Sequence, residues 1–249
     1  MIYKIPQGRD GILCALFESF CSKEKPTLVT SGSFQTIFGE TIKEIEYSDY
    51  TATRVRDGLL KIGGTTLVSR IFYALRSNDE KKENLCFSVA SKCLKQRKNI
   101  LEDYADEDVL THFDLCRKIS YETHRMTGFL RFQECSGNFY AAVFAPDNDI
   151  LDLVSVHFQK RFKGYPFLIA DEKRKKILFY NGQNVTIKKV EENVLLFTTD
   201  SEAQYVSLWQ KYFSSVSIKE RKNQRLQDGW LPRRYRKNMS EFTPPKTFN

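Results

Sequence analysis

The chain has 249 residues, of which 41% are hydrophobic and 28% are charged. This composition excludes a disordered or fibrous protein, because a chain of this length and hydrophobic content can bury a sizeable core. Lys and Arg outnumber Asp and Glu by 39 to 31, and the resulting net charge of +8 favours polyanionic partners without proving that they bind.

Residues 1–106 are predicted to form a mixed N-terminal half of helices and short strands. A helix is expected at about 9–20, because Ile12, Leu16 and Phe20 recur every four residues. Short strands are predicted at 2–5, 27–30 and 41–47. Two further helices carry Val55–Ile62 and Leu67–Leu75, and Gly63-Gly64 separates them.

The six cysteines, at positions 14, 21, 86, 93, 116 and 135, favour reduced thiols in a cytoplasmic protein. No signal peptide precedes Lys4, and no apolar run is long enough to cross a bilayer, so no membrane association is expected. Cys14 and Cys21 are seven apart, as are Cys86 and Cys93, which places each pair on one helix face as core. No CxxC pair is present, so neither a metal nor a cofactor is predicted.

Residues 107–216 are expected to form a strand-rich core domain. A helix with Val109, Phe113 and Cys116 is predicted to reach about Tyr121, with His112 beside Cys116 in the core. A strand should follow in the run HRMTGFLRF, with Phe129 and Arg131 on one face. After a turn at Ser136-Gly137-Asn138, the strand 139–144 should return as a hairpin.

The second part of this domain alternates one helix with three strands. A helix is predicted at 150–162, and strands at 167–170, 177–180 and 185–190, which together indicate an antiparallel sheet flanked by helices and an α+β fold class. Thr199-Asp200-Ser201-Glu202 is predicted to form a capping box. It introduces a helix whose apolar stripe is assigned to the core: Tyr205, Leu208, Trp209, Tyr212 and Phe213.

Residues 217–249 form a basic C-terminal tail with nine Lys or Arg against three acidic residues, which carries +6 of the net charge. The tail also has Trp230 and Tyr235 among its charges, and aromatic rings can stack on bases while arginines bind phosphate. Docking on the fold itself or on a protein is the alternative. The candidate nucleic-acid-binding residues are Arg125, Arg131, Lys160, Arg161, Trp230, Arg233, Arg234, Tyr235, Arg236 and Lys237.

Two sets of residues are weak candidates for catalysis. His124 and His157 each lie close to basic residues and would suit acid–base work if the fold brought them together. Asp147, Asp149 and Asp152 resemble a loose magnesium-binding cluster, although a turn and a helix start favour acidic residues at two of these positions anyway. Signals for nucleotide hydrolysis, dinucleotide binding, zinc proteolysis and α/β-hydrolase chemistry are missing from the sequence.

Four segments together resemble a bacterial family described as DNA metabolism or DNA repair proteins: HRMTGFLRF, HFQKRF, FLIADEKRKKILFYNG and WLPRRYRKNMSEF. The resemblance covers nearly the whole chain, from Ile2 to Phe242. It implies a domain that is also found fused to uracil-DNA glycosylase-like domains. It further implies stand-alone members encoded beside a radical SAM DNA modification or repair protein.

The hypothesis from the sequence is a DNA-binding accessory protein in DNA repair or modification, which presents DNA to a radical SAM-type catalytic partner. The alternative is a DNA repair enzyme, glycosylase-like or nuclease-like, that uses the histidines or the aspartate cluster. A protein adaptor with no nucleic-acid ligand is a third possibility. RNA stays open as the ligand in place of DNA.

Overall fold

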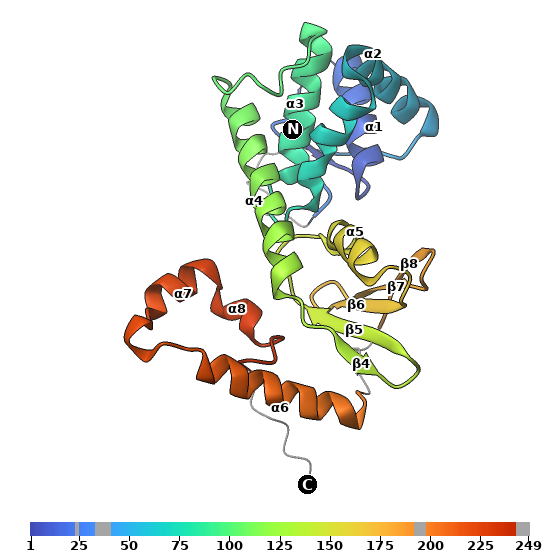
Figure 1. Ribbon diagram of the computed structural model, residues 1–249. Coiled ribbons are helices and arrows are strands. Elements are labelled where there is room, and N and C mark those ends of the chain that lie inside the picture. Colours follow the sequence, from blue (N-terminus) through green and yellow to red (C-terminus); the bar gives the residue numbers. More distant parts are fainter. Residues whose placement is uncertain (23–24, 33–40, 192–197, 243–249) are drawn as a thin grey trace. The chain divides into compact units, whose positions relative to one another are not determined.

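The computed structural model describes residues 1–22, 25–32, 41–191 and 198–242. The chain divides into two compact units, Met1–Ser120 and Tyr121–Asn249, and the division falls inside helix α4 (Glu107–Phe129). Figure 1 shows the helices and strands of both units. Helices and sheets occur in both, so the predicted α+β class is confirmed. The predicted start of the strand-rich domain, Glu107, is the first residue of α4.

The N-terminal unit contains a small parallel sheet in the strand order β2-β1-β3. Strand β1 (Ile2–Lys4) lies between β2 (Leu28–Thr30) and β3 (Ile42–Glu44), and each of these strands falls within its predicted segment. Helix α1 (Arg9–Cys21) connects β1 to β2, as a parallel pair requires.

Helices complete the core of this unit. Helix α2 (Asp49–Tyr73) is interrupted at Gly63 and Gly64, where the backbone is not helical, so the predicted break is confirmed. A 3-10 turn, η1 (Ala74–Arg76), leads to α3 (Lys82–Gln96). Buried side chains of α1, α2 and α3 form one hydrophobic cluster with Tyr3 and Val29 of the sheet.

The prediction that the cysteines lie in the core is confirmed for three of the four in the seven-residue pairs, and Cys116 is half-buried. Cys14, Cys86 and Cys93 are buried, whereas Cys21 is exposed because it is the last residue of α1. His112 is buried, and its Nε2 lies 2.8 Å from the Ile71 carbonyl oxygen, so its assignment to the core is confirmed. Burial lowers the pKa of His112, because the charged imidazolium would lose its hydration.

The strand predicted for the run HRMTGFLRF is wrong. Helix α4 continues to Phe129, and the first strand of the second unit is the short β4 (Gln133–Cys135). Ile119 and Met126 are both buried and lie seven residues apart, which is two helical turns. This helical spacing of buried side chains outweighs the local preference of the aromatics for a strand. The hairpin is therefore formed by β4 and β5 (Phe139–Phe144), and its second strand agrees with the prediction.

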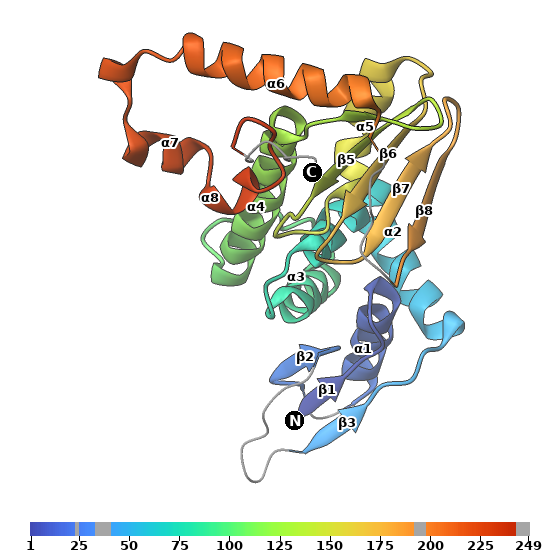
Figure 2. The same ribbon diagram turned by 90° about the horizontal axis from the view of Figure 1, so that it is seen from below.

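Over the part of the second unit that the structure describes, the sheet has five strands in the order β4-β5-β6-β7-β8, with β6 at Phe167–Asp171, β7 at Lys176–Tyr180 and β8 at Val185–Lys189. The antiparallel prediction needs one correction, because β5 and β6 are parallel. Helix α5 (Leu151–Phe162) connects these two strands as a crossover and packs on the sheet (Figure 2). Such a crossover returns the chain in its original direction and so makes the two strands parallel.

The predicted capping box at the start of α6 (Asp200–Ser215) does not form. The Glu202 carboxylate accepts a hydrogen bond from the backbone N–H of Glu134 at 3.0 Å, and the Thr199 N–H donates to the Glu134 carbonyl at 3.1 Å. The start of α6 is thereby attached to β4.

The apolar stripe of α6 was assigned to the core, and for most of its residues this is wrong. Tyr205 is 65% exposed, Trp209 41% and Tyr212 57%, and Leu208 is exposed as well. Phe213 is half-buried and packs edge-on against Phe242. Helical spacing identifies which residues share a face, but it does not supply a second element to cover that face.

The C-terminal tail is folded over its described part. It contains η2 (Lys219–Arg221), α7 (Gln224–Trp230) and α8 (Arg233–Arg236), and it buries Tyr235 and Met239. Lys246, which belongs to the predicted basic tail, lies outside the described residues. Within the described ranges, none of the helices combines the length and the apolar character that a membrane span requires.

Candidate nucleic-acid interface

A cleft of about 490 Å³ lies in the second unit and is lined by the end of α4, by α5 and by α6. It brings together Arg131 and Arg161, two of the cations predicted from the sequence. Clefts that bind small molecules or single nucleotide units have volumes of about 300–1,000 Å³. The full lining is Thr127, Gly128, Leu130–Gln133, Phe158, Arg161, Phe162, Glu202, Tyr205, Val206, Trp209 and Ser240.

One wall of the cleft is a packed group of aromatic rings. Phe132 lies 4.7 Å from Phe158 and 4.8 Å from Phe162, measured between ring centroids. Behind them, Phe167 packs on Phe132 at 5.8 Å and on Phe162 at 5.4 Å. Such tilted and edge-to-face pairs add to the free energy of hydrophobic burial, so this wall is preformed.

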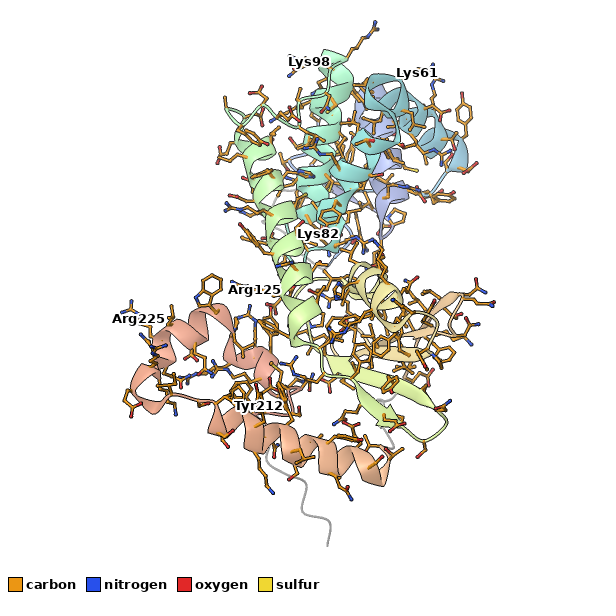
Figure 3. All side chains as sticks on the ribbon, in the orientation of Figure 1. Lys61, Lys82, Lys98, Arg125, Tyr212 and Arg225 are labelled. Atoms are coloured by element: carbon orange, nitrogen blue, oxygen red, sulfur yellow. The ribbon has the colours of Figure 1, made fainter. Side chains whose placement is uncertain are left out.

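The opposite wall is the exposed face of α6. Tyr205 and Trp209 are one helical turn apart, so their rings lie on the same side of the helix. The indole N–H of Trp209 donates to a carboxylate oxygen of Glu241 at 3.4 Å. Figure 3 labels Tyr212, the next aromatic on this side, whose ring centroid lies 5.7 Å from that of Trp209.

Arg131 is half-buried and is paired with the C-terminal segment. Its Nε and Nη2 atoms donate to the two carboxylate oxygens of Glu241 at 3.1 and 2.6 Å, and its Nη1 donates to the carbonyl of Gly128. Burial acts to raise the pKa of Glu241, but the hydrogen bonds and charge of Arg131, a backbone hydrogen bond and the Trp209 hydrogen bond together outweigh it, and the pKa is lowered. This bidentate pair leaves Arg131 little capacity to bind an external phosphate.

Arg161 is different, because it is exposed at the edge of the cleft. Within the described ranges it makes no hydrogen bond or ion pair. Lys160 precedes it and is also exposed, and His157 lies one turn earlier on the same face of α5. Arg161 is therefore available to an external anion.

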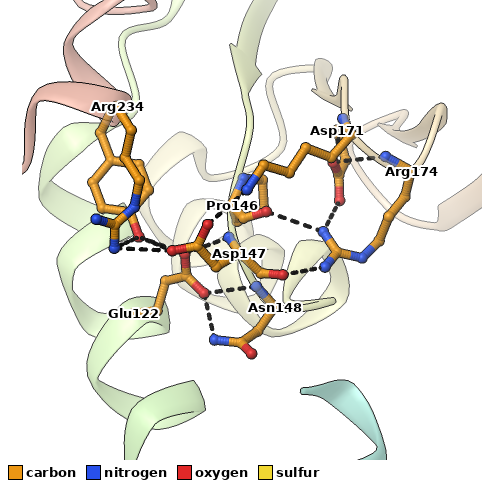
Figure 4. A network of polar contacts seen from close by, with 9 residues as sticks. Glu122, Pro146, Asp147, Asn148, Asp171, Arg174 and Arg234 are labelled. Carbon is orange, nitrogen blue, oxygen red and sulfur yellow. Dashed lines mark hydrogen bonds and ion pairs between the residues drawn. The ribbon is translucent and has the colours of Figure 1, made fainter. Parts of the chain in front are cut away.

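The loop between β5 and α5 is held by a buried carboxylate from α4 (Figure 4). Glu122 is 6% exposed and accepts hydrogen bonds from the backbone N–H groups of Asp147 and Asn148 at 2.6 and 2.8 Å. It also accepts from the Asn148 side chain at 2.6 Å and from the Tyr235 hydroxyl at 2.7 Å. Four donors satisfy this carboxylate, which allows it to be buried.

The same loop binds helix α8 and the turn between β6 and β7. Asp147 pairs with Lys173 at 2.6 Å and with Arg234 at 2.9 Å, and it accepts a hydrogen bond from Tyr235 at 3.2 Å. Burial acts to raise the pKa of Asp147, but Lys173 and Arg234 outweigh this effect and lower it. Arg174 donates to the carbonyls of Pro146 and Asp147 and pairs with Asp171 at 3.1 Å.

Tyr235 does not offer a ring for stacking, contrary to its role in the sequence prediction. It is 7% exposed, and its hydroxyl is hydrogen-bonded to Glu122. Burial, followed by the nearby Glu122 carboxylate, raises the pKa of Tyr235, so its hydroxyl is a donor at neutral pH. Tyr235 anchors α8 to the rest of the unit.

Most cations of the tail that were predicted to bind phosphate are paired internally. Arg233 and Arg236 both pair with Asp228, at 2.9 and 2.6 Å, and Lys237 pairs with Glu172 at 2.6 Å. Hydrogen bonds from Gln224 and Arg233 lower the pKa of Asp228, so it stays ionised. The net charge of this segment therefore overstates how many cations are free to bind a ligand.

Trp230 remains accessible at the end of α7. It is 72% exposed and lines a shallow hollow of about 330 Å³ with Arg225, which Figure 3 labels. Arg125 is half-buried on α4. Neither Trp230 nor Arg125 lines the cleft between α5 and α6.

The candidate catalytic residues do not form a recognisable centre. His124 and His157 are exposed on α4 and α5, each one turn before a residue that lines the cleft, and neither lines it. Asp147 belongs to the network of Figure 4, and Asp149 pairs with Lys176 at 2.5 Å. Among the residues whose structure is described, no group of three His, Cys, Asp or Glu side chains is placed to hold a metal ion.

Sequence reasoning missed the aromatic side of the cleft. Tyr205 and Trp209 were assigned to the core together with the rest of their stripe, and Phe132 was placed on a strand. A signal was present in the sequence, because the segments after α6 offer few apolar residues to cover a Trp and two Tyr side chains.

Comparison with protein families gives one match, to the family described as a domain of unknown function, DUF4130, over residues 80–241. No significant match was found among the curated proteins. No significant match was found among the solved structures either. The family match spans more than half of the chain and includes every residue of the cleft. The protein is therefore a member of the DUF4130 family.

Proposed function

We propose that the protein binds nucleic acid, and DNA in particular, as an accessory protein in DNA repair or modification. The observation that carries this proposal is the cleft whose lining includes both Arg161, which has no partner within the described ranges, and the exposed side chains of Tyr205 and Trp209. A guanidinium binds phosphate oxygens, and aromatic side chains stack on bases whatever their sequence. The net charge of +8 adds a general attraction for polyanions.

The role as an accessory protein rests on the sequence resemblance. The candidate catalytic residues are either exposed singly, as His124 and His157 are, or engaged in ion pairs, as Asp147 and Asp149 are. The proposal therefore assigns catalysis to a partner, of the radical SAM type that the resemblance implies, and assigns DNA binding and presentation to this chain.

The test is binding of a fluorescent single-stranded oligonucleotide, measured by anisotropy at several salt concentrations. Arg161→Ala should weaken binding about tenfold, because a hydrogen-bonded phosphate contact to a charged group is lost. It should also reduce the slope of log K against log salt by about 0.7. Lys61→Ala, which removes one exposed charge from the N-terminal unit, is the matched control and should change little (Figure 3). Equal losses in the two variants would contradict a site at the cleft.

The cations of the tail need a separate test. Replacing Arg233, Arg234 and Arg236 together removes partners of Asp228 and Asp147, so the variant should lose stability as well as affinity. Both the unfolding midpoint and the DNA affinity of this variant are therefore measured, so that loss of folding can be distinguished from loss of binding. Unchanged affinity in a variant that is still folded would remove these arginines from the interface.

A further inference from the structure

The residues that line the cleft favour one form of nucleic acid over another. Five of them are aromatic, and they come from the segment after α4, from α5 and from α6: Phe132, Phe158, Phe162, Tyr205 and Trp209. In a duplex the faces of the bases are covered by their stacked neighbours, and only their edges reach the grooves. Ring faces in a cleft are complementary to a base that has left the stack.

The polar groups of the cleft complement such a base. The Gln133 side-chain amide makes no hydrogen bond within the described ranges, and it carries both donors and an acceptor. Glu202 adds a carboxylate that is held in place by its hydrogen bond from Glu134. Arg161 at the edge supplies a positive charge for the phosphate attached to the base.

The exposed face of α6 extends this surface beyond the cleft. Tyr205, Trp209 and Tyr212 follow one another at intervals of four and three residues, a rise of about 6 and 4.5 Å along the helix axis. Their rings form a row on one side of the helix, and Trp209 and Tyr212 are tilted by 31° to each other. A row of rings beside a cation is a typical surface for a single strand.

We propose that the cleft beside α6 takes one unstacked base of a single-stranded nucleic acid, whose neighbouring bases stack along Tyr212 and whose phosphate contacts Arg161. This inference rests on the proposed function and refines it, because it selects single strands over duplex and a base over a bare polyanion. The charge of the site fits this ligand, since Arg131 is already neutralised by Glu241 and one cation remains at the edge.

Affinity is measured for four probes: a 12-nucleotide single DNA strand, the same sequence as RNA, its DNA duplex, and an abasic backbone of equal length. The single strands should bind at least tenfold more tightly than the duplex and the abasic backbone, because each stacked base contributes a factor of about 5 to 150. RNA should match DNA, since the rings contact the base and not the sugar. Equal affinity for all four probes would overturn this inference and leave the proposed function standing, whereas no binding to any probe would remove both.

The two tryptophans allow the site to be located. In Trp230→Phe the remaining Trp209 should lose fluorescence when the single strand binds, because a stacked base quenches an indole. In Trp209→Phe the remaining Trp230 should be unaffected. The circular dichroism of both variants is compared with that of the parent chain, and each substitution keeps an aromatic ring for packing. Quenching of Trp230 and not of Trp209 would move the base to the hollow on α7 and overturn the assignment.

Discussion

Glu122 connects its own helix, α4, to two other segments of the second unit, the loop between β5 and α5 and helix α8. Its carboxylate is buried and accepts four hydrogen bonds, from the backbone N–H groups of Asp147 and Asn148 and from the side chains of Asn148 and Tyr235. All four groups donate to Glu122, so all of them need acceptor atoms on this side chain. A side chain with two acceptor oxygens is therefore what the contacts require at this position.

Glu122→Gln should lower the free energy of unfolding by about 2–4 kcal/mol, because the amide NH₂ would face N–H donors and leave them unpaired. The measurement is urea denaturation followed by circular dichroism. Glu107→Gln is the control on the same helix, since Glu107 is exposed in the first turn of α4, and it should cost less than about 1 kcal/mol. A similar loss in both variants would contradict the role of the network.

Helix α4 is stabilised at its start by an aspartate with two functions. The Asp106 carboxylate accepts from the backbone N–H groups of Asp108 and Val109 at 3.0 and 3.2 Å, which caps the helix. Asp106 also pairs with Lys92 at 2.7 Å, and the hydrogen bond from Lys92 lowers the pKa of Asp106.

Because the pKa of Asp106 is lower in the folded than in the unfolded state, its contribution to stability is complete above the unfolded pKa of about 4 and is lost as the pH falls through the folded pKa. Asp106→Ala should cost about 1 kcal/mol at pH 7 from the lost cap alone. Asp106→Ser keeps a capping oxygen and should lower the free energy of unfolding by less than Asp106→Ala does. Because Ser does not titrate, the Ser variant should lose less stability than the parent chain between about pH 5 and 2. The measurement is the free energy of unfolding of both variants and the parent chain over this pH range. If the Ser variant lost the same amount of stability as the parent chain, the role assigned to Asp106 would be contradicted.

The break in α2 depends on a backbone conformation that glycine adopts readily. Gly64 has φ +65° and ψ −166°, a region that is almost restricted to glycine. Gly64→Ala should therefore destabilise the protein by about 1–3 kcal/mol, although the space around the position is open. Gly128→Ala, in the last turn of α4 and also in open space, should be neutral or stabilising by up to about 1 kcal/mol. Thermal unfolding compares the two, and shifts of the same sign would contradict this account.

At the scale of the whole molecule, the basic tail acts as a structural part of the second unit. Tyr235 and Arg234 bind the loop between β5 and α5, Lys237 pairs with Glu172 of the turn after β6, and Glu241 holds Arg131. The partners of these residues lie in other elements of the unit.

A chain that ends at Ser217 should therefore lose more than 3 kcal/mol of stability, because it leaves Glu122 without the Tyr235 donor and Arg131 without its carboxylate. The measurement is the denaturation midpoint of the truncated and the full chain. Arg225→Ala, which removes a charge from the same tail at an exposed position, should leave the midpoint within about 0.5 kcal/mol. An unchanged midpoint after truncation would show that the tail is dispensable for folding.

Short patterns of residues were enough to predict the fold class and much of the local structure. The repeat of Ile12, Leu16 and Phe20 correctly identified α1, the helix predicted at 150–162 agrees with α5, and Gly63-Gly64 marked the break in α2. These features depend on contacts between residues close in the chain, so they can be predicted from short stretches of the sequence. The extension of α4 to Phe129 was missed. The helix is favoured there by burial of one of its faces, and that burial depends on residues far along the chain.

The candidate site was decided by tertiary structure. Arg131 and Arg161 were both selected from the sequence, and only the fold shows that Glu241 pairs with Arg131 while Arg161 is exposed in the same cleft. Tyr235 was predicted to be accessible for stacking and is buried, whereas Trp209 was predicted to lie in the core and is exposed. The physical reason is that charge and aromatic character belong to the residue, whereas pairing and burial depend on which distant segments fold against it.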